Sequence, residues 1–414
     1  TIRYLRAALL STSLLAVLAV TLRAQSKPVI HELTKPDAAS TARFGNVIGV
    51  RALPNGSVLV NDGGRRQVLL LDATLHTSAI QIDSSGAGVQ TYGRTATMLV
   101  PYLGDSSVFV DDDAISLVVI DPNGKIVRAM APPDAKAMQF LWRYPSGFDP
   151  QGRYIFRSQF AEKYVPTKNT PAGILPVFPD SAPILRANLD TRTTDTILSV
   201  KVRRNMTIVP SIGSDGTASL DQLQEVITTV DDYAILSDGS IAIVRGQDYH
   251  VDVLRPDGTK FSGAKLPFDF KRMTDDDKQK MIDSARAAAD KRRADARAAN
   301  GTLNRPPTAP GVAAPQTKYV PIKDMPDYYP PIRIGSSIPD CDGNLWILPT
   351  TSAQSNNGEL VYDVVDNRGA FKYRVRMPPG RSVTGCAPNG VVFLISKDAR
   401  GWLLERSRID ITMK

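Results

Sequence analysis

Alternating apolar and polar residues, interrupted by tight turns, recur along most of this chain. One unit occurs six times: an apolar strand, a turn that contains Gly or Asp, and a second apolar strand. A period of two predicts half-buried β-strands, and a short turn between two such strands predicts a hairpin. The six copies are Leu53–Val60, Leu103–Val110, Asp149–Phe156, Leu236–Ile243, Pro339–Ile347 and Ala387–Leu394.

Each hairpin is followed by a third apolar segment, and most hairpins by a fourth. A second turn motif closes several of these segments, at Asp121–Gly124, Arg255–Gly258 and Asp366–Gly369. In such turns a proline, where present, fixes one backbone dihedral, and the glycine adopts the positive one. Four antiparallel strands repeated six times predict an all-β fold, a six-bladed β-propeller of four-stranded antiparallel blades.

The amino-terminal end of the fold is expected to close the ring. The sixth repeat has no clear fourth strand before Lys414, whereas a spare apolar segment, Pro28–Leu33, precedes the first repeat. We expect Pro28–Leu33 to complete the last blade as its outermost strand, which would leave no open seam. The propeller would then span residues 28–414.

Two gaps between repeats are longer than the ~40–50 residues that one blade needs. The first gap contains residues 158–182 and 203–231, and the second contains residues 267–331. Because the strands on either side keep the repeat pattern, these segments are interpreted as insertions. The second insertion lies between blades four and five.

The insertion at residues 267–331 has two parts. Thr274–Asp277 has the spacing of a helix amino-terminal capping box, and an Ala-, Lys- and Arg-rich run continues to the Asn300-Gly301 stop. The pattern therefore predicts one helix, which has few apolar residues to bury. The proline-rich segment Arg305–Pro315 follows and predicts an extended tether.

Residues 1–24 predict a secretory signal peptide. Arg3 and Arg6 precede an uncharged apolar stretch, Ala7–Leu22, and the small residue Ala24 follows it. The stretch is shorter than the roughly 20 residues that a membrane span needs, which favours cleavage over a retained anchor. No later segment has the length and apolarity of a span. We therefore expect a soluble periplasmic or extracellular protein without a membrane span after cleavage.

Charge and cysteine content narrow the classes of partner. The formal net charge is +8 and falls to about +5 without the signal peptide, with no dense Lys/Arg block. This argues against nucleic-acid binding and allows a weak preference for acidic partners. Cys341 and Cys386 could form a disulfide in an oxidising compartment, or they could be two small buried residues. Three scattered histidines complete no zinc-binding pattern with them.

Candidate ligand-binding residues lie on one predicted face. The long insertions all fall in loops that join the second and third strands of a blade, or one blade to the next, and we call this side the loop-rich face. Arginines with aromatics are typical of recognition surfaces, although these residues could instead pin the insertions and solvate the ring. The candidates are Arg66, Arg94, Trp142, Arg143, Tyr144, Arg157, Tyr164, Arg245, Tyr249, Tyr328 and Tyr329.

The chain offers weak signals for metal binding or catalysis. Asp111, Asp112 and Asp113 follow the second strand of blade two, and clustered carboxylates can hold Ca²⁺, although an exposed charged loop is the more ordinary interpretation. No Ser is accompanied by a His–Asp pair within sequence reach, so a nucleophilic triad has little support. We therefore name no catalytic residue and expect no cofactor other than calcium.

The repeats resemble those of the NHL and TolB-like six-bladed propellers of exported bacterial proteins. The match covers roughly residues 29–409 and is clearest from Ile48 to Asp72. There the Asn55-Gly56 turn, Asp62 and Val68 fall where NHL repeats have their turn, acidic residue and third-strand valine. The asparagine and arginine that follow the acidic residue in those repeats are absent here. The resemblance therefore implies the fold more strongly than a function.

Such propellers include binding scaffolds, lactone-type hydrolases, and glutaminyl cyclases or lyases, and the fold does not choose among them. The gluconolactonase-like members hold a divalent ion with a Glu on the first innermost strand. The corresponding segment here, Phe44–Val50, has no Glu, which counts against that class. We predict a binding or scaffold module for a protein, peptide or acidic glycan through the loop-rich face. The alternative is a metal-assisted hydrolase or lyase in the central channel, and the oligomeric state is left open.

Overall fold

The computed structural model describes most of the chain after the predicted signal peptide, and its residues are mostly in strands, with few helices. Residues 1–24, Asp112, Trp142, Arg143 and the proline-rich segment lie outside the described part. The described residues are 28–94, 98–111, 113–132, 144–158, 163–166, 174–177, 179–202, 206–213, 215–300, 316–353 and 359–410.

Six sheets, which we number 1 to 6 in chain order, contain the predicted hairpins. The first three have their strands in the order of the chain and antiparallel. Sheet 1 contains β3 (Val47–Ala52), β4 (Val58–Asp62), β5 (Gln67–Leu71) and β6 (Thr77–Asp83); sheet 2 contains β7 (Leu99–Pro101), β8 (Ser107–Asp111), β9 (Ser116–Ile120) and β10 (Ile126–Met130); sheet 3 contains β11 (Gly147–Phe148), β12 (Tyr154–Arg157), β15 (Ser181–Asn188) and β16 (Thr193–Lys201).

Sheets 4 to 6 repeat this arrangement, and the last two also take up amino-terminal strands. Sheet 4 contains β19 (Asp232–Ile235), β20 (Ile241–Arg245), β21 (His250–Leu254) and β22 (Lys260–Ser262); sheet 5 contains β24 (Ser337–Pro339), β25 (Leu345–Ile347), β26 (Val361–Val365), β27 (Phe371–Arg376) and β1 (Ile30–Glu32); sheet 6 contains β28 (Arg381–Ala387), β29 (Val391–Asp398), β30 (Gly401–Arg408) and β2 (Ala38–Ala39).

The apolar core consists of clusters between neighbouring sheets. Each of six clusters combines buried side chains of two sheets, and their order is 1–2, 2–3, 3–4, 4–5, 5–6 and 6–1. Strand β4 shows how the alternation produces this order, because successive side chains point to opposite faces of a strand. Val58 and Val60 pack against sheet 6, whereas Leu59 packs against sheet 2.

An amino-terminal strand does complete the last blade, but it is not formed by the predicted residues. Ala38–Ala39 pairs antiparallel with β30 as the outermost strand of sheet 6, whereas of Pro28–Leu33 only Leu33 bridges the last blade, to Ile409 just after β30. Strand β1 instead joins sheet 5, parallel to β27, where Glu32 lies 3.1 Å from Arg376 in an ion pair. Two polar partners on β27 thus hold β1, since the His31 ring also contacts the Tyr373 ring edge-on at 4.8 Å.

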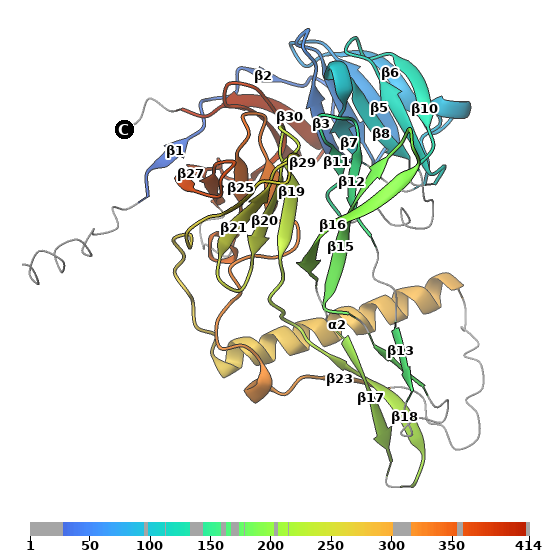
Figure 1. Ribbon diagram of the computed structural model, residues 1–414, viewed down its shortest axis with the longest axis vertical. Helices are drawn as coiled ribbons and strands as arrows, with labels where there is room; N and C mark the ends of the chain where they lie inside the picture. Colours follow the sequence, from blue (N-terminus) through green and yellow to red (C-terminus); the bar gives the residue numbers. More distant parts are fainter. Residues whose placement is uncertain are drawn as a thin grey trace, which may run out of the picture.

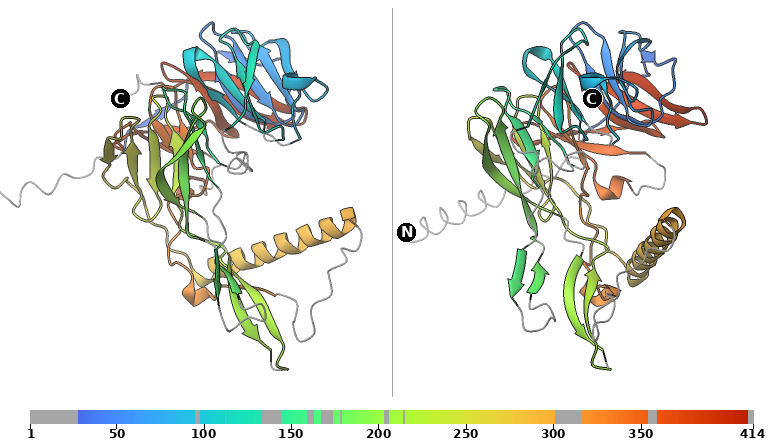
Figure 2. Two further views of the ribbon diagram at one scale, coloured as in Figure 1. Left: turned by 45° about the vertical axis from the view of Figure 1, so that its right-hand side comes forward. Right: turned by 90° about the vertical axis from the view of Figure 1, so that its right-hand side faces the viewer.

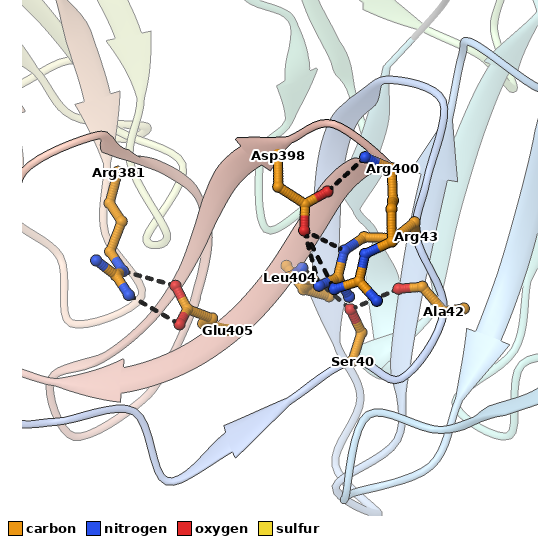
Figure 3. A network of polar contacts seen from close by, with 8 residues as sticks. All are labelled: Ser40, Ala42, Arg43, Arg381, Asp398, Arg400, Leu404 and Glu405. Atoms are coloured by element: carbon orange, nitrogen blue, oxygen red, sulfur yellow. Dashed lines mark hydrogen bonds and ion pairs between the residues drawn. The ribbon is translucent and has the colours of Figure 1, made fainter.

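Polar contacts connect the first and last sheets (Figure 3). Arg43, just before β3, donates two hydrogen bonds of 3.1 and 3.0 Å to Asp398 at the end of β29. These hydrogen bonds, foremost among several contacts, lower the pKa of Asp398 to about 2. Ser40 Oγ accepts a hydrogen bond from the Leu404 amide. The segment that leads into sheet 1 is therefore fixed to sheet 6.

A disulfide between Cys341 and Cys386 connects sheets 5 and 6. Cys341 lies in the turn after β24, and Cys386 lies in β28. The sequence left this pairing open. The bond closes a loop across 45 positions of the sequence, and it constrains the unfolded chain accordingly.

The long insertions come together beyond one end of the six sheets (Figures 1 and 2). They contribute a hairpin and a three-stranded sheet in which β18 pairs antiparallel with β17 and parallel with β23. We call these elements and the long helix the appended unit: β13 (Lys163–Pro166), β14 (Ile174–Val177), β17 (Met206–Ile212), β18 (Ala218–Gln224), α2 (Asp275–Asn300) and β23 (Thr317–Tyr319).

The predicted helix and its capping box are confirmed. Thr274 Oγ1 accepts a hydrogen bond from the Asp277 amide, and the Asp277 carboxylate accepts hydrogen bonds from the Thr274 amide and hydroxyl. Lys278 is buried, and its Nζ donates to the carbonyls of Ile322 and Met325 and to Asp327. These contacts fix the first turn of α2.

Two chain segments connect sheets 4 and 5 to α2, and we call them the link: residues 267–273 and 327–331. They pair through the Met273 amide and the Asp327 carbonyl at 2.8 Å, and through the Tyr329 amide and the Lys271 carbonyl at 3.1 Å. The remaining short helices are η1 (Gly88–Gln90), η2 (Leu103–Asp105), η4 (Ile322–Asp324) and α3 (Thr350–Ala353). Within the described ranges, no helix combines the length and apolarity that a membrane span requires.

Candidate functional site

A cleft of about 670 Å³ lies between α2 and the segments that lead into sheets 4 and 5. This volume is typical of ligand-binding sites, which occupy roughly 300–1,000 Å³. We call it the α2 cleft. Its walls come from three parts of the chain: Val226, Ile227, Thr228 and Val230; Asp277, Lys280, Met281, Ser284 and Ala285; and Tyr329, Pro330, Ile332, Arg333, Ile334 and Thr350.

The lining of the α2 cleft is mixed, with apolar residues beside polar and charged ones. Met281 and Ala285 lie one turn apart on α2, because residues separated by four positions share a helix face. Ile332 is buried in the core between sheets 4 and 5, and Tyr329 is 7% exposed, whereas Ile334 is 40% exposed. The cleft thus joins buried core on one side to open surface on the other.

At the α2 cleft, the carboxylate of Asp277 has hydrogen-bond partners, whereas the cations Lys280 and Arg333 form no ion pair among the described residues. The Asp277 carboxylate is held by Thr274 in the capping box. Lys280 and Arg333 have exposed side chains, and neither forms an ion pair with another described residue. The hydrogen bonds from Thr274, and to a smaller extent the charge of Lys280, lower the pKa of Asp277, so positive and negative charge partly offset each other at the cleft. Burial, followed by the charge of Asp277, raises the pKa of the Tyr329 phenol.

The backbone along one wall of the α2 cleft has no regular secondary structure, and Val226 and Ile227 form a bend. Strand β18 ends at Gln224, where the pairing with β17 and β23 also ends. Val226–Thr229 continue from it toward β19 and make no backbone hydrogen bond with any other described residue. These residues are half-buried. Their N–H and C=O groups therefore remain available at the cleft.

The predicted site residues do not form one cluster, and those near sheets 1 and 2 hold loops. Arg66 donates to the carbonyls of Tyr92 and Gly93 at 2.7 and 2.9 Å. The Arg94 amide donates to Asp113. Asp111, only 4% exposed, accepts hydrogen bonds from the amides of Asp113 and Ala114. No group of three His, Cys, Asp or Glu side chains suited to a metal occurs in the described ranges.

Arg245 and Tyr249 are engaged inside and beside sheet 4. Arg245 forms ion pairs of 2.7 Å with both Asp231 and Asp252. Tyr249 is 1% exposed and donates a 2.6 Å hydrogen bond to Asp363, which also accepts from Arg374. Burial raises the pKa of Tyr249 and of Asp363. Both predicted residues therefore connect secondary-structure elements.

Arg157 and Tyr144 meet near the inner strands of sheets 3 and 4. The Arg157 guanidinium carbon lies 3.2 Å from the centre of the Tyr144 ring, and the Arg157 side chain is buried with its Nε unpartnered among the described residues. Asp232, which begins β19, is also buried and accepts from the Ser337 amide at 2.8 Å. Desolvation raises the pKa of Asp232 and lowers that of Arg157.

Tyr328 and Tyr329 lie on the link and face different surroundings. Tyr329 lines the α2 cleft, whereas Tyr328 is 49% exposed and contacts the Phe270 ring edge-on. Tyr164 pairs with Pro176 through the β13–β14 hairpin. Trp142, Arg143 and Asp112 lie outside the described residues. Of the predicted set, Tyr329 alone is among the cleft residues given above.

Sequence reasoning missed most of the cleft. Val226–Thr229 have no charge or aromatic ring, and Lys280 looks like any solvated helix residue. The apolar pair Met281-Ile282 near the start of the helix could have indicated the cleft, because it predicts which face of α2 packs against the rest of the protein. The partners of that face come from residues on either side of the helix and could not be read from local pattern.

Comparisons with known proteins give no family assignment. No family model matches the chain, and no curated protein matches it significantly. Similar solved structures include a catalytically inactive virginiamycin B lyase from Staphylococcus aureus with quinupristin, at 10% identity and TM-score 0.38, covering 89% of this chain and 97% of that one. Another is a gluconolactonase from Xanthomonas campestris, at 10% identity and TM-score 0.38, covering 94% and 99%.

The calcium-binding regucalcin from Agrobacterium tumefaciens is similar at 9% identity and TM-score 0.38, covering 92% of this chain and 96% of that one. These neighbours are β-propellers of other families, so the resemblance to NHL and TolB-like proteins stays a prediction. Because their TM-scores are below 0.5, they carry no argument about the activity or ligands of this chain.

Proposed function

We propose that sheets 1 to 6 are the blades of a six-bladed β-propeller, exported to the periplasm or the cell exterior. The cyclic order of the six apolar clusters supports a closed ring, because sheet 6 packs against sheet 1 as well as sheet 5. The disulfide suits an oxidising compartment. The predicted signal peptide supports the same location.

The protein acts as a binding module for another protein or a peptide, and the partner enters the α2 cleft. This proposal rests on the composition of that cleft: apolar residues that reach the core, polar side chains beside them, and the exposed cations Lys280 and Arg333. Interfaces with an apolar centre and a charged rim are typical of specific association.

Filling the α2 cleft tests this function. Ala285→Trp places a large side chain in the cleft, and Ala288→Trp places the same side chain on an exposed part of the same helix. We expect the tagged wild type and the Ala288→Trp variant to capture the same protein from the periplasmic or secreted fraction. Ala285→Trp should lose it. Equal capture by all three proteins would contradict binding in the cleft.

Buried charges near the inner strands favour a second candidate, a metal-assisted hydrolase or lyase in the central channel. Asp232 and Arg157 are both buried, and the raised pKa of Asp232 is a feature of many catalytic carboxyl groups. Metal analysis and melting in the presence of a chelator test it. A stoichiometric divalent ion whose removal lowers the melting temperature would favour this function over the binding module.

A further inference from the structure

A second cavity, of about 300 Å³, lies beside the three outer strands of sheet 5, and we call it the sheet 5 pocket. Its walls come from β1, β26 and β27, from the start of the link, and from the segment around α3. No described residue lines both this pocket and the α2 cleft. The volume lies at the lower end of the range for sites that hold a small molecule.

The charged side chains of the sheet 5 pocket largely neutralise one another. Arg374 donates a 2.7 Å hydrogen bond to the buried carboxylate of Asp363. Arg376 forms ion pairs with Glu32 and Glu359, at 3.1 and 3.6 Å. Both guanidinium groups therefore already have carboxylate partners, and the pocket has no excess of positive charge with which to hold an anion.

Hydrogen-bonding groups of both kinds nevertheless remain without partners. A guanidinium has five N–H donors, and Arg374 uses its Nε for Asp363 and its Nη2 for the Pro267 carbonyl at 3.0 Å. The Nε of Arg376 is buried and has no hydrogen-bond partner. Among the acceptors, the exposed carboxylate of Asp269 has no partner in the described part of the chain. A ligand that fits this pocket must therefore both accept and donate hydrogen bonds.

Apolar surface limits the class of ligand further. Phe268 and Val361 line the same pocket, together with Ile30, which is 37% exposed. A cation donates hydrogen bonds but does not accept them, and an anion would lie near Glu359 and the unpaired Asp269. A sugar ring meets both demands, since each hydroxyl donates and accepts, and its C–H groups present an apolar face to side chains.

We infer that the sheet 5 pocket binds a neutral sugar unit, with its hydroxyls on Arg374, Arg376 and Asp269 and a ring face against Phe268. This second site goes beyond the proposed function and does not depend on it. The affinity should be modest, because the sugar exchanges hydrogen bonds to water for hydrogen bonds to the protein.

Saturation-transfer NMR on the full chain tests sugar binding, with glucose, galactose and mannose as probes. We expect at least one of these sugars to bind saturably. Its matched uronic acid, which has a carboxylate in place of the terminal hydroxymethyl group, should bind about fivefold or more weakly, because the unpaired charge of the pocket is negative. No saturable binding by any of the neutral sugars, or equal affinity for the matched uronic acid, would overturn the inference.

Two variants test whether the sugar lies in the sheet 5 pocket. Asp269→Ala removes the free carboxylate, and Arg376→Lys keeps the positive charge for its ion pairs but loses the planar N–H fork. Each should weaken binding by about tenfold, as expected for a lost hydrogen bond to a charged group. Asp195→Ala and Arg128→Lys, the same changes at exposed positions outside the pocket, should bind like the wild type. Normal binding by both pocket variants would overturn the inference.

Ala285→Trp separates this inference from the proposed function. The variant fills the α2 cleft and leaves the sheet 5 pocket unchanged. It should therefore bind the sugar like the wild type, whether or not it still captures a protein. Loss of sugar binding in Ala285→Trp would place the sugar in the α2 cleft and overturn the separate site.

Discussion

The six sheets and the appended unit are stabilised in different ways. Between the sheets, apolar clusters bury side chains such as Phe109 and Leu59 almost completely. In α2, by contrast, Lys278 and Ile282 are the buried residues among those whose burial is described. The helix is held at its first turn by a capping box, a buried ammonium group and the link. The fold thus keeps a large apolar core in one region and leaves apolar surface open in the other.

This difference explains where a binding site can form. A well-packed core has few voids, so each inter-sheet cluster leaves little room for a ligand. An element fixed at one end and packed loosely along its length leaves a cleft beside it. The α2 cleft lies where the two regions meet, and it takes residues from both.

Truncation of the core should have the largest effect on stability. Phe109→Ala removes a fully buried ring between sheets 1 and 2 and should lower the free energy of unfolding by about 3–5 kcal/mol. Phe270→Ala truncates a ring that is 54% exposed on the link and contacts Phe268 edge-on, and it should lower this free energy by only about 0.5–1.5 kcal/mol. Chemical denaturation of both variants measures the difference. Similar losses would contradict the contrast between the regions.

Loss of the disulfide should have the next largest effect. The Cys341→Ser, Cys386→Ser double variant relaxes the connection between sheets 5 and 6, and it should lose about 2–4 kcal/mol of stability. Added reductant should destabilise the wild type and leave the variant unchanged. A wild type that melts identically with and without reductant would argue against a stabilising disulfide.

Lys278 should matter locally rather than globally. Lys278→Ala leaves the carbonyls of Ile322 and Met325 without their donor, and it should reduce the free energy of local opening at α2 by about 1–3 kcal/mol. Hydrogen exchange measures this in the α2 amides, while amides of sheets 1 to 6 should keep their protection. The exposed Lys291→Ala is the matched control. A global loss of protection would mean that the helix supports the sheets.

The sequence predicts features that depend on neighbouring residues and misses those that depend on long-range contacts. The hairpins, their turn glycines and the capping box depend on residues close in sequence, and they are present as predicted; Gly56, for example, has a φ of 83° in its turn. The pairing of β18 with β23 joins Gln222 to Thr317, and no local pattern encodes a contact at that distance. Tyr329 was predicted as an aromatic residue of an insertion, whereas Val226–Thr229, which have neither charge nor ring, gave no such signal.

Acid should release the contact between the two insertions, with a smaller effect. Lys318 of β23 lies 2.6 Å from Asp221 of β18, and this hydrogen bond lowers the pKa of Asp221 from 3.8 to about 2. Because the folded pKa is the lower one, the contact contributes fully above pH of about 4 and is lost as the pH falls through about 2. Amide chemical shifts of β23 should follow this titration, and Lys318→Met should shift it upward. A titration unaffected by Lys318→Met would contradict the assignment.

Deletion of residues 267–331, with a short flexible linker in their place, tests most directly whether a self-sufficient ring carries a separate binding unit. Calorimetry of the deletion variant should show one cooperative melting transition, and the variant should no longer capture the partner that the wild type binds. A variant without a cooperative transition, or a folded variant that still captures the partner, would contradict this division of the molecule.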